Sequence, residues 1–596
     1  MLTIHTSEGV LHTDAAPGRT LLSVLHESGV FVDAPCGGNG TCGKCRAYAS
    51  GEVSPLSHEE RLHLNADELS AGMRLACKTI LLGDAVVRLP QARAMLVETE
   101  GTGEPIELRP AVRRIPLTVP DGSLAEQTSD MTRVLRALGE ASPGAEYVPS
   151  LTALRRAPAL LREHGGRVDA VVYRGRLLNL LPPDRPLIGM AVDIGTTTVA
   201  AYFHDLASGE QLGVRSGMNP QRAFGADVIS RIAASENGGL FEEQRAITGL
   251  LSGMLRSFCE GRGLRADSVC HLTVAANTTM LHLLAGIDPR NIAVAPFLPA
   301  TRFGLDLRAS DLGLPACPDA PVTLLPCVSS YVGADIVAGM AAFGLDRSDE
   351  KTLYIDIGTN GEMAYAGGGR ILCCATAAGP AFEGAHIECG SGGVPGAVRG
   401  ARLEDGRIVL EPIGGGKSLS ICGSGLIDLV SVLLKIGALD ETGRLADEDE
   451  LEPPFDACIN AEGDFVLDAE TGLRITAKDI REVQLAKAAV RAGICTLLDS
   501  VGETAESLDR LVVAGGFGAH IRPESACDIG LFPPDALDKY QTAGNAAGRG
   551  AILALLNEDA AGRMEQLADR CEYLELSGSD VFQNHYIEQM MFGEDF

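Results

Sequence analysis

Four cysteines near the start of the chain have the spacing of a metal site. Cys36, Cys42 and Cys45 lie in one glycine-rich stretch and Cys77 follows later, which gives the pattern C-x5-C-x2-C-x31-C. Glycines let such a loop fold tightly and turn its N–H groups toward sulfur, and the distant thiolate completes the Cys₄ set of a [2Fe–2S] cluster. Structural zinc usually takes two C-x-x-C pairs, and only one is present. The spacing therefore predicts a [2Fe–2S] cluster, with zinc or free thiols as alternatives.

The residues before this stretch predict the elements that position it. Leu2–His5 and Gly9–Thr13 read as short strands, and a helix is expected from about Thr20 to Ser28. This order resembles the β-grasp ferredoxin domain, and the cysteine loop, one residue longer than the plant spacing, resembles that of the vertebrate-type ferredoxins. The other cysteines show no ligand spacing, and we interpret them as small buried hydrophobes.

Two apolar strands farther along the chain end in the same four residues. Asp193–Thr196 returns as Asp356–Thr359, which suggests two copies of one architectural half. A hard cation on nucleotide phosphates is usually held by one or two carboxylates, so Asp193 and Asp356 are expected to organise Mg²⁺ and the attacking water. The expected phosphate donors in the two turns are Gly195, Thr196, Thr197, Gly358, Thr359 and Asn360. Taken singly, each turn also has the composition of an ordinary structural turn.

The common nucleotide fingerprints are absent. Gly415–Ser418 looks like the end of a P-loop, but Glu411 stands where that motif needs its first glycine. No G-x-G-x-x-G follows a strand, which removes the usual dinucleotide interpretation. A third turn, Val512–Gly518, follows an apolar strand, and its Gly515, Gly516 and Gly518 suit close approach to a nucleoside.

In this order the elements resemble the actin, hexokinase and sugar-kinase superfamily. Asp193–Thr197 is similar to its first phosphate motif, Asp356–Asn360 to its second and Val512–Gly518 to its adenosine motif. Gly544–Ala551 is similar to the second connecting helix between the halves. The resemblance implies a duplicated actin-like ATPase domain that closes over ATP and Mg²⁺.

A ferredoxin domain ahead of such an ATPase resembles the reductive activators of corrinoid-dependent methyltransferase systems. The strings that carry this resemblance are Asn219–Ile232, Asn277–Leu284, Gly379–Ala385, Cys422–Asp428 and Asp479–Lys487. The resemblance implies return of an inactivated corrinoid protein from Co(II) to Co(I), with one electron from the [2Fe–2S] cluster and with ATP hydrolysis. It implies nucleotide contacts for Gly423, Ser424 and Gly425, an external low-potential electron donor and a homodimer.

Other roles are less constrained by the sequence. Asp335 is a candidate general base, and an ordinary carboxylate at a helix N-terminus is the equal alternative. His386 and Ser391 follow Phe382 in a glycine-rich loop and are candidates to approach the corrin, against the simpler interpretation of a surface loop. Relatives commonly continue with Met-Arg-Ala after the counterpart of Gly390, where this chain has Ser391-Gly392-Gly393. This difference bears on which corrinoid protein fits the loop, and it does not affect the expected fold or reaction type.

The composition of the chain indicates which partners and which cellular location to expect. The formal charge of −29 repels phosphate backbones and anionic lipid, so neither nucleic acid nor a membrane is an expected partner. The start of the chain lacks the pattern of a signal peptide, and a cytoplasmic location is expected. We expect an α/β multidomain protein: a ferredoxin domain (1–90), a linker (91–110), a small mixed domain (111–185) and the ATPase halves (186–596).

Three alternative functions remain at this stage. A nucleotide-gated scaffold would tether the ferredoxin domain to a partner without net turnover, and phosphate release would separate it from an enzyme. An activator of another low-potential metalloenzyme, such as a radical dehydratase, would carry the [4Fe–4S] ligands that this ferredoxin loop lacks. A sugar kinase would share the nucleotide site but leave the iron–sulfur domain without a purpose.

Overall fold

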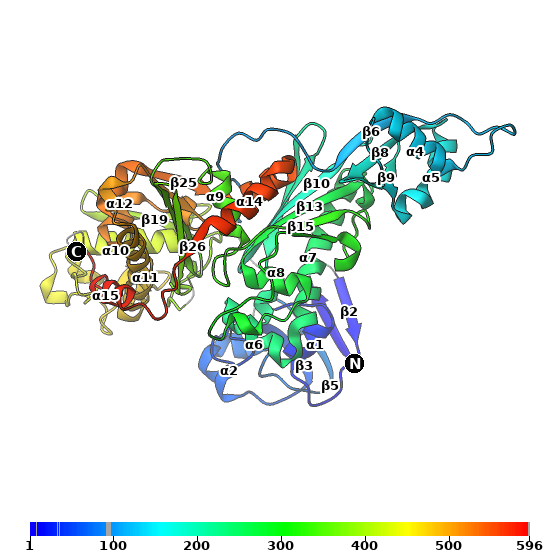
Figure 1. Ribbon diagram of the computed structural model, residues 1–596. Helices are drawn as coiled ribbons and strands as arrows, with labels where there is room; N and C mark the ends of the chain where they lie inside the picture. Colours follow the sequence, from blue (N-terminus) through cyan, green and yellow to red (C-terminus); the bar gives the residue numbers. More distant parts are fainter. Residues whose placement is uncertain (7–8, 33, 35, 91–96, 385, 594–596) are drawn as a thin grey trace. The chain divides into compact units, whose positions relative to one another are not determined.

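The computed structural model describes residues 1–6, 9–32, 34, 36–90, 97–384 and 386–593. The chain forms two compact units (Figure 1). The first comprises Met1–Ala92 and Pro110–Leu324, and the second comprises Arg93–Arg109 and Leu325–Phe596. The chain therefore passes from the first unit to the second, back to the first, and finally to the second.

The N-terminal residues form a five-stranded sheet in the order β2-β1-β5-β3-β4 with α1 packed on it. Its elements are β1 (Leu2–Thr6), β2 (Gly9–Thr13), α1 (Leu21–Glu27), β3 (Arg46–Val53), α2 (His58–His63), α3 (Ala66–Ser70), β4 (Met73–Leu75) and β5 (Leu81–Arg88). The Thr20 side chain caps α1 by accepting a hydrogen bond from the Ser23 N–H. The predicted strands and helix are thereby confirmed.

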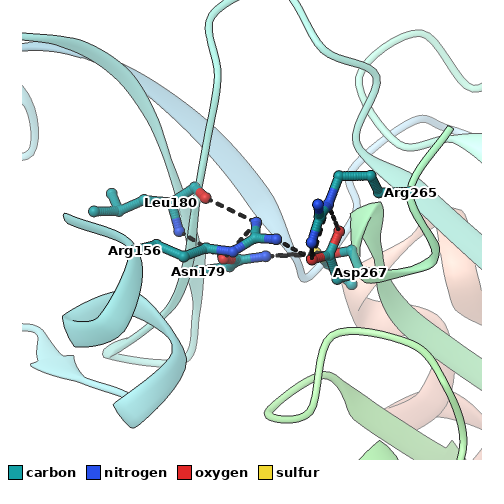
Figure 2. Close-up of polar contacts among 6 residues, drawn as sticks. Arg156, Asn179, Leu180, Arg265 and Asp267 are labelled. Atoms are coloured by element: carbon teal, nitrogen blue, oxygen red, sulfur yellow. Dashed lines mark hydrogen bonds and ion pairs between the residues drawn. The ribbon is translucent and has the colours of Figure 1, made fainter. Parts of the chain in front are cut away.

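A small mixed domain follows, with a sheet in the order β6-β8-β9-β7 and two helices. Its elements are β6 (Arg113–Thr118), α4 (Asp130–Ala141), β7 (Val148–Pro149), α5 (Leu151–Glu163), β8 (Arg167–Tyr173) and β9 (Arg176–Leu181). Figure 2 shows how it is fastened to the rest of the first unit: Arg156 on α5 pairs with Asp267, and the Asn179 amide donates to the Asp267 carbonyl at 3.2 Å.

The first ATPase half contains a six-stranded sheet in the order β12-β11-β10-β13-β15-β14. Its elements are β10 (Ile188–Ile194), β11 (Thr198–Asp205), β12 (Gln211–Met218), α6 (Val228–Ala234), α7 (Leu240–Gly261), β13 (Val269–Ala276), α8 (Thr278–Ala285), β14 (Leu305–Arg308) and β15 (Pro321–Leu324). β10 is antiparallel to β11 and parallel to β13.

The second half repeats five strands of this topology in the order β25-β24-β16-β17-β18, and its sixth strand, β26, pairs with β18, whereas β14 of the first half pairs with β15 at the opposite edge. Its main elements are α9 (Ala334–Ala342), β16 (Thr352–Ile357), β17 (Gly361–Gly367), β18 (Arg370–Thr376), α10 (Gly423–Lys435), α11 (Ala477–Val501), β24 (Arg510–Ala514), β25 (Tyr540–Gly544), α13 (Ala546–Leu556), α14 (Glu558–Arg570) and β26 (Cys571–Tyr573). β16 is antiparallel to β17 and parallel to β24, as β10 is to β11 and β13. The shared order of these five strands confirms the predicted duplication, and α13 lies in the segment expected to form the second connecting helix.

Additional elements surround the second sheet. They are β19 (Ala397–Glu404), β20 (Arg407–Pro412), β21 (Ser420–Ile421), β22 (Phe465–Asp468), β23 (Leu473–Ile475), α12 (Pro523–Asp528) and α15 (Asp580–Glu588). One large apolar core joins the second sheet, α10 and α11, and the C-terminal Phe592 is buried in it.

The predicted linker lies partly outside the described residues, at 91–96. Its described part runs as a strap along the second unit. The Thr102 N–H donates to the Ala543 carbonyl at 3.0 Å, and the Arg109 N–H donates to the Leu556 carbonyl at 2.8 Å. A Cβ added at Gly101 would lie 2.3 Å from the Asn545 carbonyl oxygen, so the strap requires glycine for this close approach. This segment is a packed part of the second unit.

Candidate functional site

The four predicted cluster cysteines lie together in two pairs. Cys42 Sγ is 3.3 Å from Cys36 Sγ, and Cys45 Sγ is 3.3 Å from Cys77 Sγ. All four are free thiols. No group of three or more metal-ligating side chains converges within the described residues. Two pairs of thiols are the donor set that two tetrahedral iron atoms need, so the residues fit an iron–sulfur cluster.

In each pair the surroundings favour one thiolate and one thiol: burial raises the pKa of Cys42 to about 11, and the contact with Cys45 raises the pKa of Cys77. Burial raises the pKa of Cys36, but contacts from Cys42 and from the N–H groups of Thr41 and Gly40 outweigh it and lower the pKa to about 6. The contact with Cys77 lowers the pKa of Cys45 to about 7. N–H groups directed at sulfur are typical of cluster loops, because they stabilise the negative charge.

A buried ion pair holds the strand that leads to Cys77. Glu60 is fully buried and its Oε1 lies 2.7 Å from Arg74 Nε. Glu60 Oε1 also accepts from the Leu75 N–H at 3.1 Å, and Oε2 accepts from the Ser57 N–H at 2.8 Å. Since the carboxylate is fully hydrogen-bonded, it fixes α2 against β4.

The first predicted phosphate loop follows β10, where Asp193 is the penultimate residue of the strand. The Gly195 N–H donates to the Thr198 carbonyl at 2.9 Å, which closes the turn into β11. The Asn277 side chain donates to Thr196 Oγ1 at 3.2 Å, so the loop after β13 lies against the loop after β10. Asp193, Thr196 and Thr197 are partly exposed at this edge of the sheet.

Two buried side chains hold the first phosphate loop from behind. Asn219 Nδ2 donates to the Gly195 carbonyl at 2.8 Å, and the Asn219 N–H donates to the Thr197 carbonyl at 2.8 Å. Arg231 Nη2 donates to the Thr196 carbonyl at 2.5 Å, and both Asn219 and Arg231 are fully buried. Three successive loop carbonyls are thereby occupied, which fixes the path of the loop.

The second predicted phosphate loop follows β16 and closes with a shorter turn than the first. The Gly358 N–H donates to the Asn360 carbonyl at 2.9 Å. Asp356 lies directly opposite Glu362 in the antiparallel pairing of β16 and β17, and the Asn360 amide donates to Glu362 Oε1 at 3.2 Å. Burial, together with the charges of Asp335 and Asp356, raises the pKa of Glu362 well above its usual value.

The adenosine-type turn meets the second phosphate loop at Gly515. This residue has φ +94°, and an added Cβ would lie 2.8 Å from Asp356 Oδ1 and 2.7 Å from the Ile357 carbonyl oxygen. Gly516 is exposed beside it, whereas Gly518 is buried against Val513. The structure therefore brings together Asp356 and Gly515, which belong to two different predicted motifs.

The segment 379–384 links the parts of this second site. Thr359 Oγ1 donates to Glu383 Oε1 at 2.8 Å. The Phe382 ring stacks on Phe517 with centroids 5.2 Å apart. A Cβ on Gly423 would lie 1.9 Å from the Phe382 carbonyl oxygen, so the start of α10 packs directly on this segment.

The structure gives the start of α10 a packing role. Gly423, Ser424 and Gly425 are buried, and Ser424 Oγ donates to the Arg399 carbonyl at 2.8 Å. A Cβ on Gly425 would lie 2.1 Å from the Val398 carbonyl oxygen. These contacts explain the two glycines, and the expected nucleotide contact of the three residues stays a prediction.

Asp335 lies in the first turn of α9, where its Oδ1 accepts from the Ile336 N–H at 2.9 Å. Burial raises its pKa to about 6. The side chain thus has the geometry of a helix N-terminal carboxylate and a pKa suited to proton transfer near neutral pH.

His386 and Ser391 have different surroundings. The His386 side chain is 65% exposed, with its Nδ1 3.7 Å from Glu482 Oε2. Ser391 Oγ lies 2.7 Å from Ser420 Oγ and is partly buried. The His386 side chain is thus largely exposed to solvent, whereas the Ser391 hydroxyl contacts Ser420.

Sequence reasoning assigned no role to Asn219, Arg231, Asn277, Glu362 and Glu383. Four of these residues lie in the strings that carry the family resemblance, which was the available signal for them. Glu362 lies outside those strings, but its place opposite Asp356 follows from a tight hairpin after the second phosphate motif.

Comparisons with known families match the chain almost throughout. A 2Fe-2S iron-sulfur cluster binding domain matches residues 6–82, and the RACo linker region matches 101–185. The RACo middle region matches 188–348, and the C-terminal domain of RACo, the ASKHA domain, matches 350–595. The chain therefore contains an iron–sulfur domain and a nucleotide-binding ASKHA domain, which confirms the expected fold class.

Two curated relatives align over most of the chain. The corrinoid activation enzyme RamQ of Eubacterium limosum is 30% identical over 608 residues, covering 98% of this chain and 98% of that protein. The Co(II) methylated amine-specific corrinoid protein reductase of Methanosarcina barkeri is 25% identical over 439 residues, covering 68% of this chain and 77% of that protein.

The solved structure of a reductive activator for a corrinoid, iron–sulfur protein has a TM-score of 0.73 and 30% sequence identity to this chain. The alignment covers 100% of this chain and 98% of that structure. Within the described residues, no helix has both the length and the apolar character needed to cross a membrane. From the paired thiols, the duplicated phosphate loops and these full-length matches, the chain belongs to the family of ferredoxin–ASKHA reductive activators of corrinoid proteins.

Proposed function

We propose that this protein is an ATP-dependent reductive activator that returns an inactivated corrinoid protein from Co(II) to Co(I). The observation that carries the proposal is the presence, in one chain, of two thiol pairs in a ferredoxin fold and two strand–turn phosphate loops in a duplicated ATPase fold. An ATPase does not need a ferredoxin domain, and a ferredoxin does not need an ATPase domain. Together they suit a reaction in which electron delivery depends on nucleotide.

The proposed cofactors are a [2Fe–2S] cluster, ATP and Mg²⁺. Cys36 and Cys42 would hold one iron, and Cys45 and Cys77 the other, because the thiols lie in these pairs. When bound, the cluster supplies one electron at low potential. The proposed domains are the ferredoxin domain at 1–90, the linker at 91–110, the mixed domain at 111–185 and the ATPase halves at 186–596.

The roles proposed for the ATPase residues follow from their positions. Asp193 and Asp356 bind Mg²⁺ and orient the attacking water, while the turns after them donate N–H and hydroxyl groups to phosphate. Glu383 fixes the Thr359 hydroxyl, and Asn219 and Arg231 fix the first loop. Asp335 is the proposed general base, since its pKa of about 6 allows it to accept a proton near neutral pH.

The difference in reduction potential between the cluster and the cobalt explains why electron transfer would be coupled to ATP hydrolysis. A plant-type [2Fe–2S] centre has a potential near about −400 mV, and Co(II) in the corrinoid substrate is expected to be harder to reduce. Each ~59 mV of unfavourable one-electron difference costs about 1.4 kcal/mol. Nucleotide-driven binding offsets this cost by changing the axial ligation of cobalt in the Co(II) substrate and so raising its potential, and the shift is limited by the difference in the protein's affinity for the two states.

The test is anaerobic reduction of a purified Co(II) corrinoid protein by the reconstituted full chain, followed by its absorbance spectrum with and without ATP. We expect Asp193→Ala to abolish reduction while the cluster spectrum is retained. Cys77→Ser is expected to lose the cluster spectrum and retain nucleotide binding. Full Co(II) reduction by Asp193→Ala would contradict the proposed coupling.

A nucleotide-gated ferredoxin scaffold is the second candidate, because Asp335 also has the geometry of a plain helix N-terminal carboxylate. Steady-state phosphate release stimulated by the Co(II) corrinoid protein supports the activator, and its absence supports the scaffold. The proposed setting is cytoplasmic, with an external low-potential electron donor and a homodimer.

A further inference from the structure

We propose that Phe224 is a positioning residue that fixes the ferredoxin domain against the segment holding the first phosphate loop, so that nucleotide binding and the cluster's environment are linked. The inference rests on the proposed function, because it needs nucleotide at that loop. It concerns contacts within the first compact unit, which contains both the ferredoxin domain and the first ATPase half.

One end of the connection is the phosphate loop. The segment 219–231 begins at Asn219 and ends at Arg231, and these two buried side chains donate to the carbonyls of Gly195 and Thr196. Arg231 Nε also donates to the Gly225 carbonyl at 3.0 Å, which ties the middle of the segment to its end. A shift of the phosphate loop therefore has to move these residues or break buried hydrogen bonds, which is costly.

The other end is the ferredoxin domain. The Phe224 ring lies 5.1 Å from the ring of His26 and 6.1 Å from that of Phe31, measured between centroids. The Phe224 carbonyl oxygen lies close enough to Gly37 that an added Cβ there would approach it to 3.3 Å. Gly37 follows the cluster ligand Cys36 directly. Phe224 thus contacts both α1 and the cluster loop.

The contact is apolar and closely packed. Phe224 is only 8% exposed and forms a small core with Ala223 and Ala246, against which Phe31 packs. Burial lowers the pKa of His26 to about 4, so the imidazole is neutral at physiological pH and contributes apolar surface. The connection between the two domains therefore includes close ring packing.

Thermodynamic linkage between nucleotide binding and the oxidation state of the cluster can be measured. If nucleotide binding changes the environment of the cluster, the oxidation state of the cluster must change nucleotide affinity by the same factor. Coupling between sites typically amounts to about fivefold or more. The two measurements are independent, so their agreement is a test in itself.

The experiment uses the reconstituted full chain under anaerobic conditions, with ATP and Mg²⁺ as the probe. The cluster midpoint potential is measured with and without nucleotide, and nucleotide affinity is measured on oxidised and reduced protein. Hydrogen exchange over residues 24–43 reports the contact directly. In the wild type we expect at least about a fivefold change in affinity with oxidation state and an equivalent shift in potential.

Three variants separate the connection from general damage. Phe224→Ala is expected to lose both linked effects while the oxidised protein still binds nucleotide, and Phe224→Leu is expected to restore most of them. His26→Ala breaks the same contact from the ferredoxin side, so it remains informative if Phe224→Ala fails to fold. Phe241→Ala is the matched control, since Phe241 in the same half is 68% exposed, and it should behave as the wild type.

The outcomes are distinct. Linked effects that survive unchanged in Phe224→Ala or His26→Ala would overturn the inference, as would nucleotide binding in the wild type without any change in potential, affinity or exchange. Failure of the wild type to bind nucleotide at all would refute the proposed function, and the inference with it. Loss of both effects in these two variants, with the control unchanged, supports Phe224 as the positioning residue.

Discussion

At the scale of single residues, Gly515 lies closer to Asp356 than any side chain at that position would allow. Its φ of +94° is strained for other residues, and an added Cβ would lie 2.8 Å from the Asp356 carboxylate. Gly515→Ala is expected to destabilise the protein by about 1–3 kcal/mol and to displace Asp356, which weakens nucleotide binding about tenfold or more. Thermal unfolding and nucleotide titration measure the two effects.

The matched control is Gly562. Gly516 belongs to the predicted nucleoside turn, so a glycine outside that turn is used: a Cβ on Gly562, in α14 (Glu558–Arg570), would have no heavy atom within 4 Å. Gly562→Ala should leave both stability and nucleotide affinity close to those of the wild type. Equal losses in the two variants would show that the close approach at Gly515 is unimportant.

Glu60 is the second residue for which structure gives a definite expectation. Glu60→Ala leaves the buried Arg74 guanidinium without its ion-pair partner, at a cost of about 3–5 kcal/mol. The expected result is faster loss of the cluster absorbance on heating, because β4 leads directly to Cys77. Glu59→Ala, which removes an exposed partner of Lys78, should change the transition little.

Low pH is expected to destabilise the ferredoxin domain by protonating Glu60. Burial raises the pKa of Glu60, but hydrogen bonds from Arg74, Ser57 and Leu75 outweigh it and hold the pKa below its usual value. The stabilisation is therefore present above the unfolded pKa of about 4.3 and is lost as pH falls through the folded value. An acid transition unchanged in Glu60→Ala would contradict this role.

At the scale of elements, α11 holds the C-terminal segment through a buried lysine. Lys487 is 1% exposed and donates to the Met591 carbonyl, with its Nζ 5.4 Å from the Phe592 ring centroid. The Phe592 N–H donates to the Glu441 carbonyl at 2.8 Å, which completes the attachment. Burial lowers the pKa of Lys487 to about 7.

This pKa predicts a pH dependence with a defined sign. Between pH 7 and about 10.4 the unfolded chain binds more protons at Lys487 than the folded chain, so stability rises with pH across this window. Lys487→Met should remove a rise on the order of a few kcal/mol in the free energy of unfolding. Denaturant titrations at several pH values measure it.

A second lysine on α11 provides the comparison. Lys478 is exposed in the first turn of the helix, so Lys478→Met should keep the pH dependence of the wild type. If Lys487→Met and the wild type showed the same pH profile, the buried lysine would have an ordinary pKa.

At the scale of the whole molecule, charge sets the range of partners. A net charge of −29 gives a field that repels nucleic acid and attracts basic surfaces. We predict no retardation of duplex DNA in a gel-shift experiment at low salt, where such binding would be strongest. A retarded complex that weakens steeply as salt rises would contradict this prediction.

The sequence predicted features that depend on neighbouring residues better than features that depend on contacts between distant segments. The strands near Asp193 and Asp356, the helix capped by Thr20 and the Cys₄ spacing are local patterns, and the structure confirms the elements. The repeated four residues predicted a duplication because each half has an equivalent strand ahead of the loop, although the two loops close with different hydrogen bonds. Asn219 and Arg231 could not be assigned a role in this way, because they hold the phosphate loop from another part of the chain.

The sequence by itself determined which residues have the side-chain chemistry and short spacing expected of ligands for iron, a cation and phosphate. Only the tertiary structure decided that the thiols lie in two pairs, that Glu362 faces Asp356, that the start of α10 is packed against protein, and that Phe224 meets the ferredoxin domain. Each of these contacts joins segments that are distant along the chain or opposite across strands. Their formation depends on which surfaces the folded core brings together, and no local pattern records that choice.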